Sequence, residues 1–395
     1  MGYVPASPRE PYDHGRMRAR SHDFSIPEGV SYLNCAYMAP LPRRVEEAGI
    51  AGVRRKRDPG RIEARHFFEE SDRARALFAA LIGGDAAGVA IVPGVSYGLE
   101  VVARNVRPSA GAAFVVLQDQ FPANVYPWRA LAARAGAFIE TVARPRDGAD
   151  WTDAVCAAIG PGVALVALPE VHWTDGSLLD LERVAERARE VGAALVVDGT
   201  QSIGAHPFDV GRIRPDAVVC AAYKWLLGPY SLGFLWLGER FRDGEPIEHT
   251  WIGRGGSEDF RALVDYRDDL REDASRFDVA ERSNFALMPM AVAALEYLGE
   301  LSVGAVRAHC SGLTRAIEAE ASTLGAAAPA GPRAGHIVGL RLPEGVDGAR
   351  VHEALRARRV HVSRRGDALR ISPHVYNDGE DVAALLEGLR EALRA

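Results

Sequence analysis

Residues 194–202 read Ala-Leu-Val-Val-Asp-Gly-Thr-Gln-Ser, and residues 217–228 read Ala-Val-Val-Cys-Ala-Ala-Tyr-Lys-Trp-Leu-Leu-Gly. Each stretch is a short apolar run followed by a polar residue, Asp198 in the first and Lys224 in the second. Continuous apolar runs of this length are typical of strands that are buried on both faces of a sheet. Ligands of open α/β sheets bind at the carboxyl ends of such strands, so both side chains are candidates for a site.

The same rhythm begins at residue 88, where short apolar runs start to alternate with stretches of helical spacing, and one short strand and two helical stretches are expected before it. The expected strands are 30–34, 88–93, 113–118, 138–142, 163–169, 194–198, 217–222 and 231–238, and helices are expected at 43–56, 62–82, 98–106, 123–136, 151–159 and 179–191. This alternation predicts an α/β fold with a mostly parallel sheet that helices cover on both faces.

The pattern changes after a polar, glycine-containing stretch at 240–285. We expect a helix near 287–324, then a strand at 336–342, a helix at 347–357, strands at 358–363 and 368–372, and a helix at 379–393. The chain is therefore expected to divide into an N-terminal arm that joins the small domain (1–45), a large domain (46–285) and a small C-terminal α/β domain (286–395).

Composition narrows the choice of partner. The chain has 395 residues, a formal net charge of −6, and no basic stripe that would suggest nucleic acid. No run reaches the roughly 18 apolar residues of a membrane span, and the N-terminus lacks the apolar segment of a signal peptide, so a cytoplasmic protein is expected. The four cysteines form no CxxC pair, which favours reduced thiols and no metal site.

Asp198 and Lys224 together indicate a cofactor. A buried carboxylate requires a cationic partner, and a protonated pyridine nitrogen is one. A lysine among apolar and aromatic residues has a lowered pKa, which provides the neutral amine that Schiff-base chemistry requires. We therefore expect pyridoxal 5′-phosphate (PLP), with Asp198 on the ring nitrogen, Lys224 on the aldehyde and Gln201 on the ring hydroxyl.

The segment Gly94-Val95-Ser96-Tyr97-Gly98 follows an expected strand and opens an expected helix. A helix N-terminus after a glycine turn offers free N–H groups to a phosphate. The same letters spell G-x-S-x-G, the nucleophile elbow of serine α/β-hydrolases. That alternative makes Ser96 the nucleophile, with Asp198 and His374 as partners, but it leaves Lys224 without a role.

Taken together, these residues resemble the class V aminotransferase family of fold-type-I PLP enzymes, in the branch of kynureninases, group II cysteine desulfurases and isopenicillin-N-epimerase-like proteins. The resemblance covers roughly residues 30–393. It rests on motifs in the family's order: Tyr32-Leu33-Asn34, Phe121-Pro122, Asp198-Gly-Thr-Gln201, Tyr223-Lys224, Trp251, Ser283-Asn284, and Arg370 with Tyr376-Asn377 after it.

The resemblance implies a role for each motif. Phe121 stacks on the cofactor ring, and Gly94, Val95, Ser96 and Tyr223 surround the phosphate. Trp251, Ser283 and Asn284 reach the phosphate from the neighbouring subunit, which makes the protein a homodimer with shared active sites. Asn34, Trp173 and Arg370 contact the substrate, and Arg370 holds its α-carboxylate.

The chain departs from the family pattern at three places. Ala221 stands where a phosphate-binding Ser or Thr is common, and Trp173 stands where an asparagine is frequent. No cysteine follows Cys310, although desulfurases carry their nucleophilic cysteine on the loop before the arginine, so persulfide formation is not expected.

The resemblance implies a PLP enzyme that joins an amino acid to the cofactor as a Schiff base and removes the α-proton with Lys224. A lyase that eliminates a β- or γ-substituent or cleaves a C–S or C–C bond is the first expectation. Aminotransferase and epimerase activity on the same scaffold follow as alternatives. A non-catalytic PLP-binding protein and the serine hydrolase are more distant ones.

Overall fold

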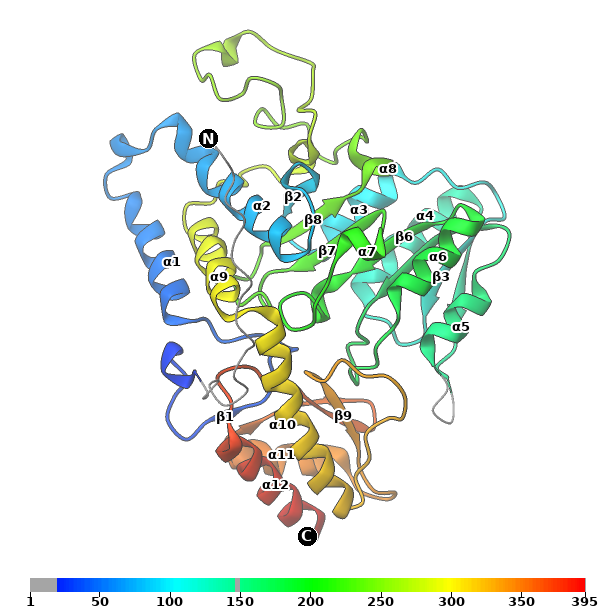
Figure 1. The fold of residues 1–395 in the computed structure, drawn as a ribbon. Helices are drawn as coiled ribbons and strands as arrows, with labels where there is room; N and C mark the ends of the chain where they lie inside the picture. Colours follow the sequence, from blue (N-terminus) through cyan, green and yellow to red (C-terminus); the bar gives the residue numbers. More distant parts are fainter. Residues whose placement is uncertain (1–19, 146–149, 395) are drawn as a thin grey trace, which may run out of the picture.

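The computed structural model describes residues 20–145 and 150–394, so residues 1–19 of the expected N-terminal arm lie outside the described residues. A seven-stranded sheet occupies the centre of the larger part of the molecule (Figure 1). Its strands, in spatial order, are β2 (Val89–Val92), β8 (Gly233–Leu237), β7 (Ala217–Ala221), β6 (Ala194–Asp198), β5 (Val163–Pro169), β3 (Ala113–Leu117) and β4 (Phe138–Val142).

This sheet is mostly parallel, as predicted, because β8 alone runs antiparallel to its neighbours β2 and β7. Val, Leu and Ala fill β5 and β6 almost completely, and both strands have the bounds that the sequence predicts. Strands buried on both faces need such continuous apolar runs, since neither face meets water.

Helices cover both faces of the sheet. One face packs against α3 (Val95–Asn105) and α4 (Tyr126–Ala135), whose buried residues share an apolar core with alternate strand residues. The other face packs against α2 (Glu69–Leu81), α5 (Trp151–Ala158), α6 (Leu181–Val191) and α7 (Val210–Ile213). The predicted helix at 62–82 is shorter, since a separate 3-10 turn at Ala64–Phe67 precedes α2.

A pair of helices lies beside this sheet. In the pair, α1 (Arg43–Arg55) packs on α9 (Leu287–Leu301). The segment between α8 (Glu239–Arg242) and α9 extends away from the body, at the top of Figure 1.

The prediction of one helix near 287–324 is wrong, because the chain bends by 74° between α9 and α10 (Val303–Thr323). Ser302 adopts a positive φ of 61° at the bend, and its hydroxyl accepts the Ala305 N–H to begin the second helix.

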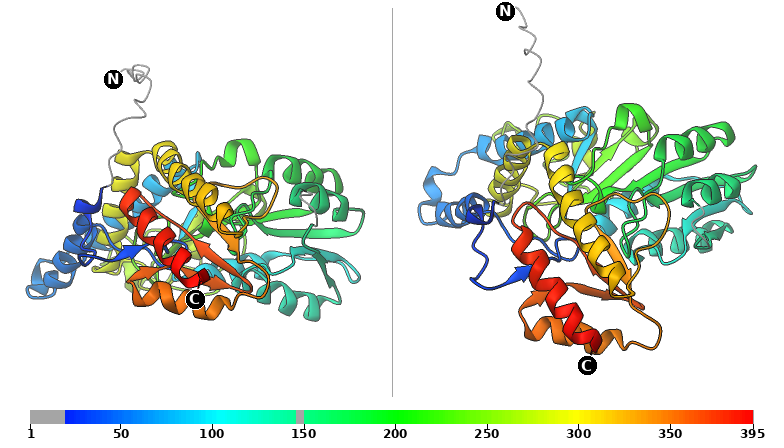
Figure 2. Two further views of the ribbon diagram at one scale, coloured as in Figure 1. Left: turned by 90° about the horizontal axis from the view of Figure 1, so that it is seen from below. Right: turned by 60° about the horizontal axis from the view of Figure 1, so that its bottom comes forward.

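The smaller part of the molecule has its own sheet and core. Strands β11 (Ser363–Arg365), β12 (Ala368–Ile371) and β9 (Val338–Arg341) form an antiparallel sheet that shares an apolar core with α10, α11 (Gly348–Ala357) and α12 (Gly379–Arg394). Figure 2 shows α10 and α12 side by side along it. The expected strand 358–363 divides in two, because β10 (Val360–His361) pairs instead with β1 (Ser31–Tyr32).

Within the described ranges, no single helix is long and apolar enough to cross a membrane; only the bent pair α9–α10 reaches that length and composition when taken together.

Candidate functional site

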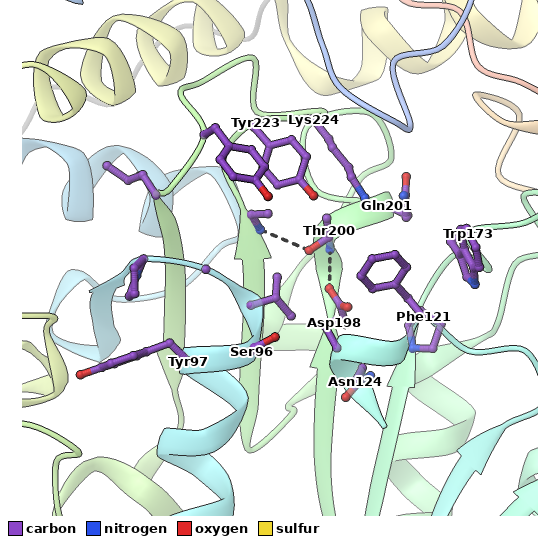
Figure 3. Close-up of a pocket in the computed structure, with 18 of the residues that line it drawn as sticks. Ser96, Tyr97, Phe121, Asn124, Trp173, Asp198, Thr200, Gln201, Tyr223 and Lys224 are labelled. Atoms are coloured by element: carbon purple, nitrogen blue, oxygen red, sulfur yellow. Dashed lines mark hydrogen bonds between the residues drawn. The ribbon is translucent and has the colours of Figure 1, made fainter. Parts of the chain in front are cut away.

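A cavity of about 410 Å³ opens at the carboxyl ends of β5, β6 and β7 and at the start of α3. It contains eight of the predicted cofactor residues: Gly94, Val95, Ser96, Phe121, Asp198, Gln201, Tyr223 and Lys224. Trp173 also lines it, so residues separated by more than 100 positions in the sequence meet at one place. Figure 3 shows Lys224, Asp198 and Phe121 around the same space.

Lys224 follows β7 and is buried, with 5% of its surface exposed. Its Nζ lies 5.2 Å from the ring centroid of Phe121 and 5.4 Å from that of Tyr223. Burial, together with the positive charge of Arg370, lowers the pKa of the lysine to about 8. A substantial fraction of this amine is therefore neutral and nucleophilic near neutral pH.

Asp198 is the last residue of β6, and its carboxylate accepts the Thr200 N–H at 3.1 Å. Burial raises the pKa of this carboxyl above its usual range. Across the described residues, no arginine, lysine or histidine forms an ion pair with it, although it lines the cavity. A buried carboxylate without a cationic partner suits a protonated ring nitrogen.

The expected phosphate-binding turn lies where β2 leads into α3. Gly94 precedes the helix, and Val95 and Ser96 form its first turn, so their N–H groups lack partners within the helix. A methyl group added to Gly94 would meet no atom within 4 Å, so the turn is open toward the cavity. This end of the cavity fits a phosphate at a helix N-terminus.

The hydrolase alternative finds no support in this geometry. Ser96 makes no hydrogen bond to a histidine in the part of the chain that the structure describes. His374 is fully buried outside the cavity, with its ring 5.7 Å from the Trp225 ring.

Gln201 lines the cavity, but its amide already has two partners. Its Oε1 accepts the Trp225 indole N–H at 2.8 Å, and its Nε2 donates to the Ala36 carbonyl at 3.1 Å. One amide hydrogen remains for the ring hydroxyl, so its expected role stays a prediction. Phe121 remains 37% exposed and meets Trp173 edge to face at 5.3 Å, which leaves its ring available for stacking.

Arg370, on β12, lies beside Trp173. Its Nη1 donates to the Trp173 carbonyl at 2.9 Å, while its Nε is buried without a partner. Burial and the nearby Arg365 lower the pKa of its guanidinium, so an anion would be stabilised there. Asn34 reaches this arginine indirectly, because its Oδ1 accepts the Ser363 hydroxyl, which lies 3.5 Å from Arg370 Nη2.

Three predicted cofactor residues do not line the cavity of their own chain. Trp251 is 40% exposed and packs against Phe67, and Ser283 donates to the Phe67 carbonyl. Asn284 accepts the N–H groups of Ala286 and Leu287 at the start of α9. Their expected role in a neighbouring subunit stays a prediction.

Sequence reasoning missed several residues that line the cavity: Tyr97, Gln120, Asn124, Thr200 and Tyr230. Thr200 has a clear local role, since its hydroxyl accepts the Ala221 N–H at 3.2 Å (Figure 3). This bond joins the turn after β6 to the end of β7, so it fixes Asp198 relative to the segment that carries Lys224. The sequence could have indicated Thr200, because it lies inside the motif Asp198-Gly-Thr-Gln201.

Together these groups fit PLP. The turn at Gly94 fits the phosphate, Phe121 the ring face, Asp198 the ring nitrogen, and the amine of Lys224 the aldehyde. The described residues contain no cluster of three or more His, Cys, Asp or Glu that could hold a metal ion.

Comparison with known proteins agrees with this fit. The model of the family "Aminotransferase class-V" matches residues 60–385. Isopenicillin N epimerase of Streptomyces clavuligerus is 28% identical over 375 residues, which cover 91% of this chain and 94% of the relative. An uncharacterized aminotransferase of Bacillus subtilis (strain 168) is 30% identical over 320 residues, 80% of this chain and 81% of the relative.

Solved structures share the fold. The cystine C–S lyase C-DES, in complex with its product cysteine persulfide, superposes with a TM-score of 0.83 at 20% identity, covering 92% of this chain and 97% of that one. A cysteine desulfurase from Thermococcus onnurineus NA1 gives a TM-score of 0.80 at 22% identity, covering 94% and 97%.

Proposed function

We propose that this chain, which belongs to the class V aminotransferase family of PLP-dependent enzymes, acts on an amino acid as a lyase that cleaves a bond in the side chain. The observation that carries the proposal is the buried amine of Lys224, which faces the cavity opposite Asp198 and has a pKa of about 8. An amine with that pKa both captures an aldehyde and accepts a proton from carbon near neutral pH.

Each residue of the site has a distinct task in this proposal. When bound, PLP supplies an electron sink that stabilises negative charge at the substrate α-carbon. Asp198 holds a proton on the ring nitrogen through its buried carboxylate. Arg370 orients the α-carboxylate, and Lys224 Nζ accepts the α-proton.

A lyase also needs an acid that protonates the leaving group. Tyr223 and Tyr230 both line the cavity, with their rings 4.6 Å apart. Burial raises the pKa of Tyr223 to about 12, so its phenol keeps its proton at neutral pH and can donate it.

We further propose that the enzyme forms no persulfide on a cysteine of its own. Cys35, Cys220 and Cys310 are buried, Cys156 is half-buried, and none of the four lines the cavity. Burial raises the pKa of Cys35 and Cys220, which disfavours the reactive thiolate.

Epimerisation is the second candidate, favoured by the similarity to isopenicillin N epimerase over nearly the whole chain. Transamination is the third. All three begin with removal of the α-proton and differ in what the protein does next.

Product analysis in D₂O separates the three reactions. A panel of amino acids is incubated with the holoenzyme, and products are identified by NMR and mass spectrometry, with Lys224→Ala as the control. Without an added amino acceptor, a lyase that eliminates a substituent releases a keto acid, ammonia and the side-chain fragment, and one that cleaves a C–C bond releases a shorter amino acid and the fragment. Inverted amino acid carrying deuterium at the α-carbon as the sole product would contradict the lyase proposal, as would turnover that requires a keto-acid acceptor.

We propose that the active form is a homodimer in which Trp251, Ser283 and Asn284 of one subunit complete the partner's phosphate site. Their positions outside their own cavity, with Trp251 40% exposed, support this arrangement. We also propose the division into domains at 46–285 and 286–395, with the N-terminal arm joined to the smaller one, which the pairing of β1 with β10 supports.

A further inference from the structure

Trp173 forms a wall between two cavities. Its side chain lines the cofactor cavity and also a second cavity of about 310 Å³, which Arg365 on β11 lines as well. The indole is held in place, because its N–H donates to the Asp119 carbonyl at 2.7 Å and its ring meets Phe121 edge to face. The second cavity therefore begins where the first one ends.

Two arginines lie against this wall. The guanidinium carbon of Arg365 is 5.2 Å from the Trp173 ring centroid, and that of Arg370 is 5.8 Å away. The two guanidinium carbons are therefore at most about 11 Å apart. Both positive charges lower the pKa of the Lys224 amine.

Neither arginine has a carboxylate partner among the ion pairs of the described residues. Arg370 is 1% exposed, and the Nε atoms of both side chains are buried without an acceptor. Arg365 donates through Nη1 to the carbonyl of its neighbour Arg364. Two guanidinium groups that contact the same indole ring and have N–H donors without acceptors favour the binding of an anion.

The other charges around the second cavity are largely paired. Arg144 bonds to Asp175 at 2.5 Å, and Arg341 lies 3.8 Å from Asp367. Asp119 also lines the cavity, but it forms no ion pair with Arg365 within the described ranges. Among the described residues that line the second cavity, Arg365 is therefore the arginine without a carboxylate partner, and it can bind an incoming acid.

We propose that Arg365 binds a second carboxylate of the substrate, so that the enzyme acts on amino acids whose side chain ends in a carboxylate. Arg370 holds the α-carboxylate and Arg365 holds the distal carboxylate, each beside the ring of Trp173. This inference rests on the proposed function, which places an amino acid between Arg370 and Lys224. The inference adds that the substrate's side chain carries a negative charge, a property that the proposed function leaves open.

Ligands without an amine test the pair directly, because they cannot join the cofactor. Glutarate and its monoamide differ by one charge at nearly equal size, and succinate and adipate vary the spacing of the carboxylates. Their dissociation constants for the holoenzyme are measured by calorimetry, with the cofactor absorbance recorded on the same samples. We expect the best dicarboxylate to bind on the order of tenfold more tightly than its monoamide.

The variants assign this preference to one side chain. Arg365→Gln should lose the preference while binding of the monoamide stays unchanged, and Arg365→Lys should restore part of it. Arg364→Gln is the matched control, since Arg364 is the exposed neighbour on the same strand and should keep the full preference.

Equal affinities for dicarboxylate and monoamide in the parent protein would overturn the proposal, as would equal losses in Arg365→Gln and Arg364→Gln. The two proposals fail separately. A holoenzyme that shows the preference but converts no amino acid contradicts the proposed function alone. One that converts amino acids without the preference contradicts the second carboxylate site alone.

Discussion

Replacing Arg370 by glutamine should raise the pKa of Lys224 and slow the capture of the cofactor at neutral pH. Arg370 is the largest source of charge that lowers this pKa, after burial itself. The pKa falls from 10.5 to about 8 in the folded protein. Since burial is the larger cause, we expect the variant to recover about one unit, which places its pKa near 9.

The size of the effect follows from the fraction of neutral amine. At pH 7.5 this fraction is about one quarter for a pKa of 8 and about 3% for a pKa of 9, so capture should slow about eightfold. A raised pKa moves the neutral form to higher pH, so the difference should shrink as the pH rises above 9.

The assay follows the growth of cofactor absorbance after apoenzyme is mixed with PLP between pH 6.5 and 9.5. The ratio of variant to parent rate at each pH cancels the titration of PLP itself. Arg364→Gln should match the parent at every pH. A parent capture rate that still rises tenfold per pH unit up to pH 9.5, or the same pH profile in Arg370→Gln and the parent, would refute the account of how Lys224 is activated.

Three further outcomes follow from the geometry. Asp198→Asn should still capture PLP on Lys224 but lose turnover by about a hundredfold or more, because a neutral amide cannot hold the ring proton; unchanged turnover would exclude this role. Asn34→Ala should raise KM several-fold with the cofactor absorbance intact, since it frees the Ser363 hydroxyl beside Arg370; steady-state kinetics would measure this, and an effect on kcat alone would argue against it. Gly52→Ala should lower the free energy of unfolding by about 1–3 kcal/mol in urea, because the added methyl overlaps the carbonyl of Phe285, whereas Gly304→Ala, with no atom within 4 Å, should be neutral or stabilising.

The sequence was most informative where a buried sheet imposes its own pattern. Strands β5 and β6 have the predicted bounds because only apolar residues can fill a strand covered on both faces. The site at their carboxyl ends could be predicted for the same reason, since Asp198 and the segment before Lys224 end such runs.

Local breaks were harder to predict. The bend at Ser302 depends on a positive φ in a residue that is neither glycine nor proline, so no composition signal marks it. The division of 358–363 between β10 and β11 depends on pairing with residues more than 300 positions away.

The contacts of individual side chains could not be predicted from the sequence either. Gln201 was expected at the cofactor, yet Trp225 and Ala36 already occupy most of its amide. Arg365 lies in the segment before Arg370, which the sequence analysis used only for its lack of a cysteine. The contact of Arg365 with Trp173 joins residues far apart in the sequence, so only the fold shows it.

The most direct test of the central claim is reduction of the holoenzyme with borohydride, followed by mapping of the labelled peptide by mass spectrometry. We predict loss of the visible absorbance and a single reduced pyridoxyl group on Lys224, with no covalent label in Lys224→Ala. A label on another lysine, or a label that persists in Lys224→Ala, would contradict the assignment of the site.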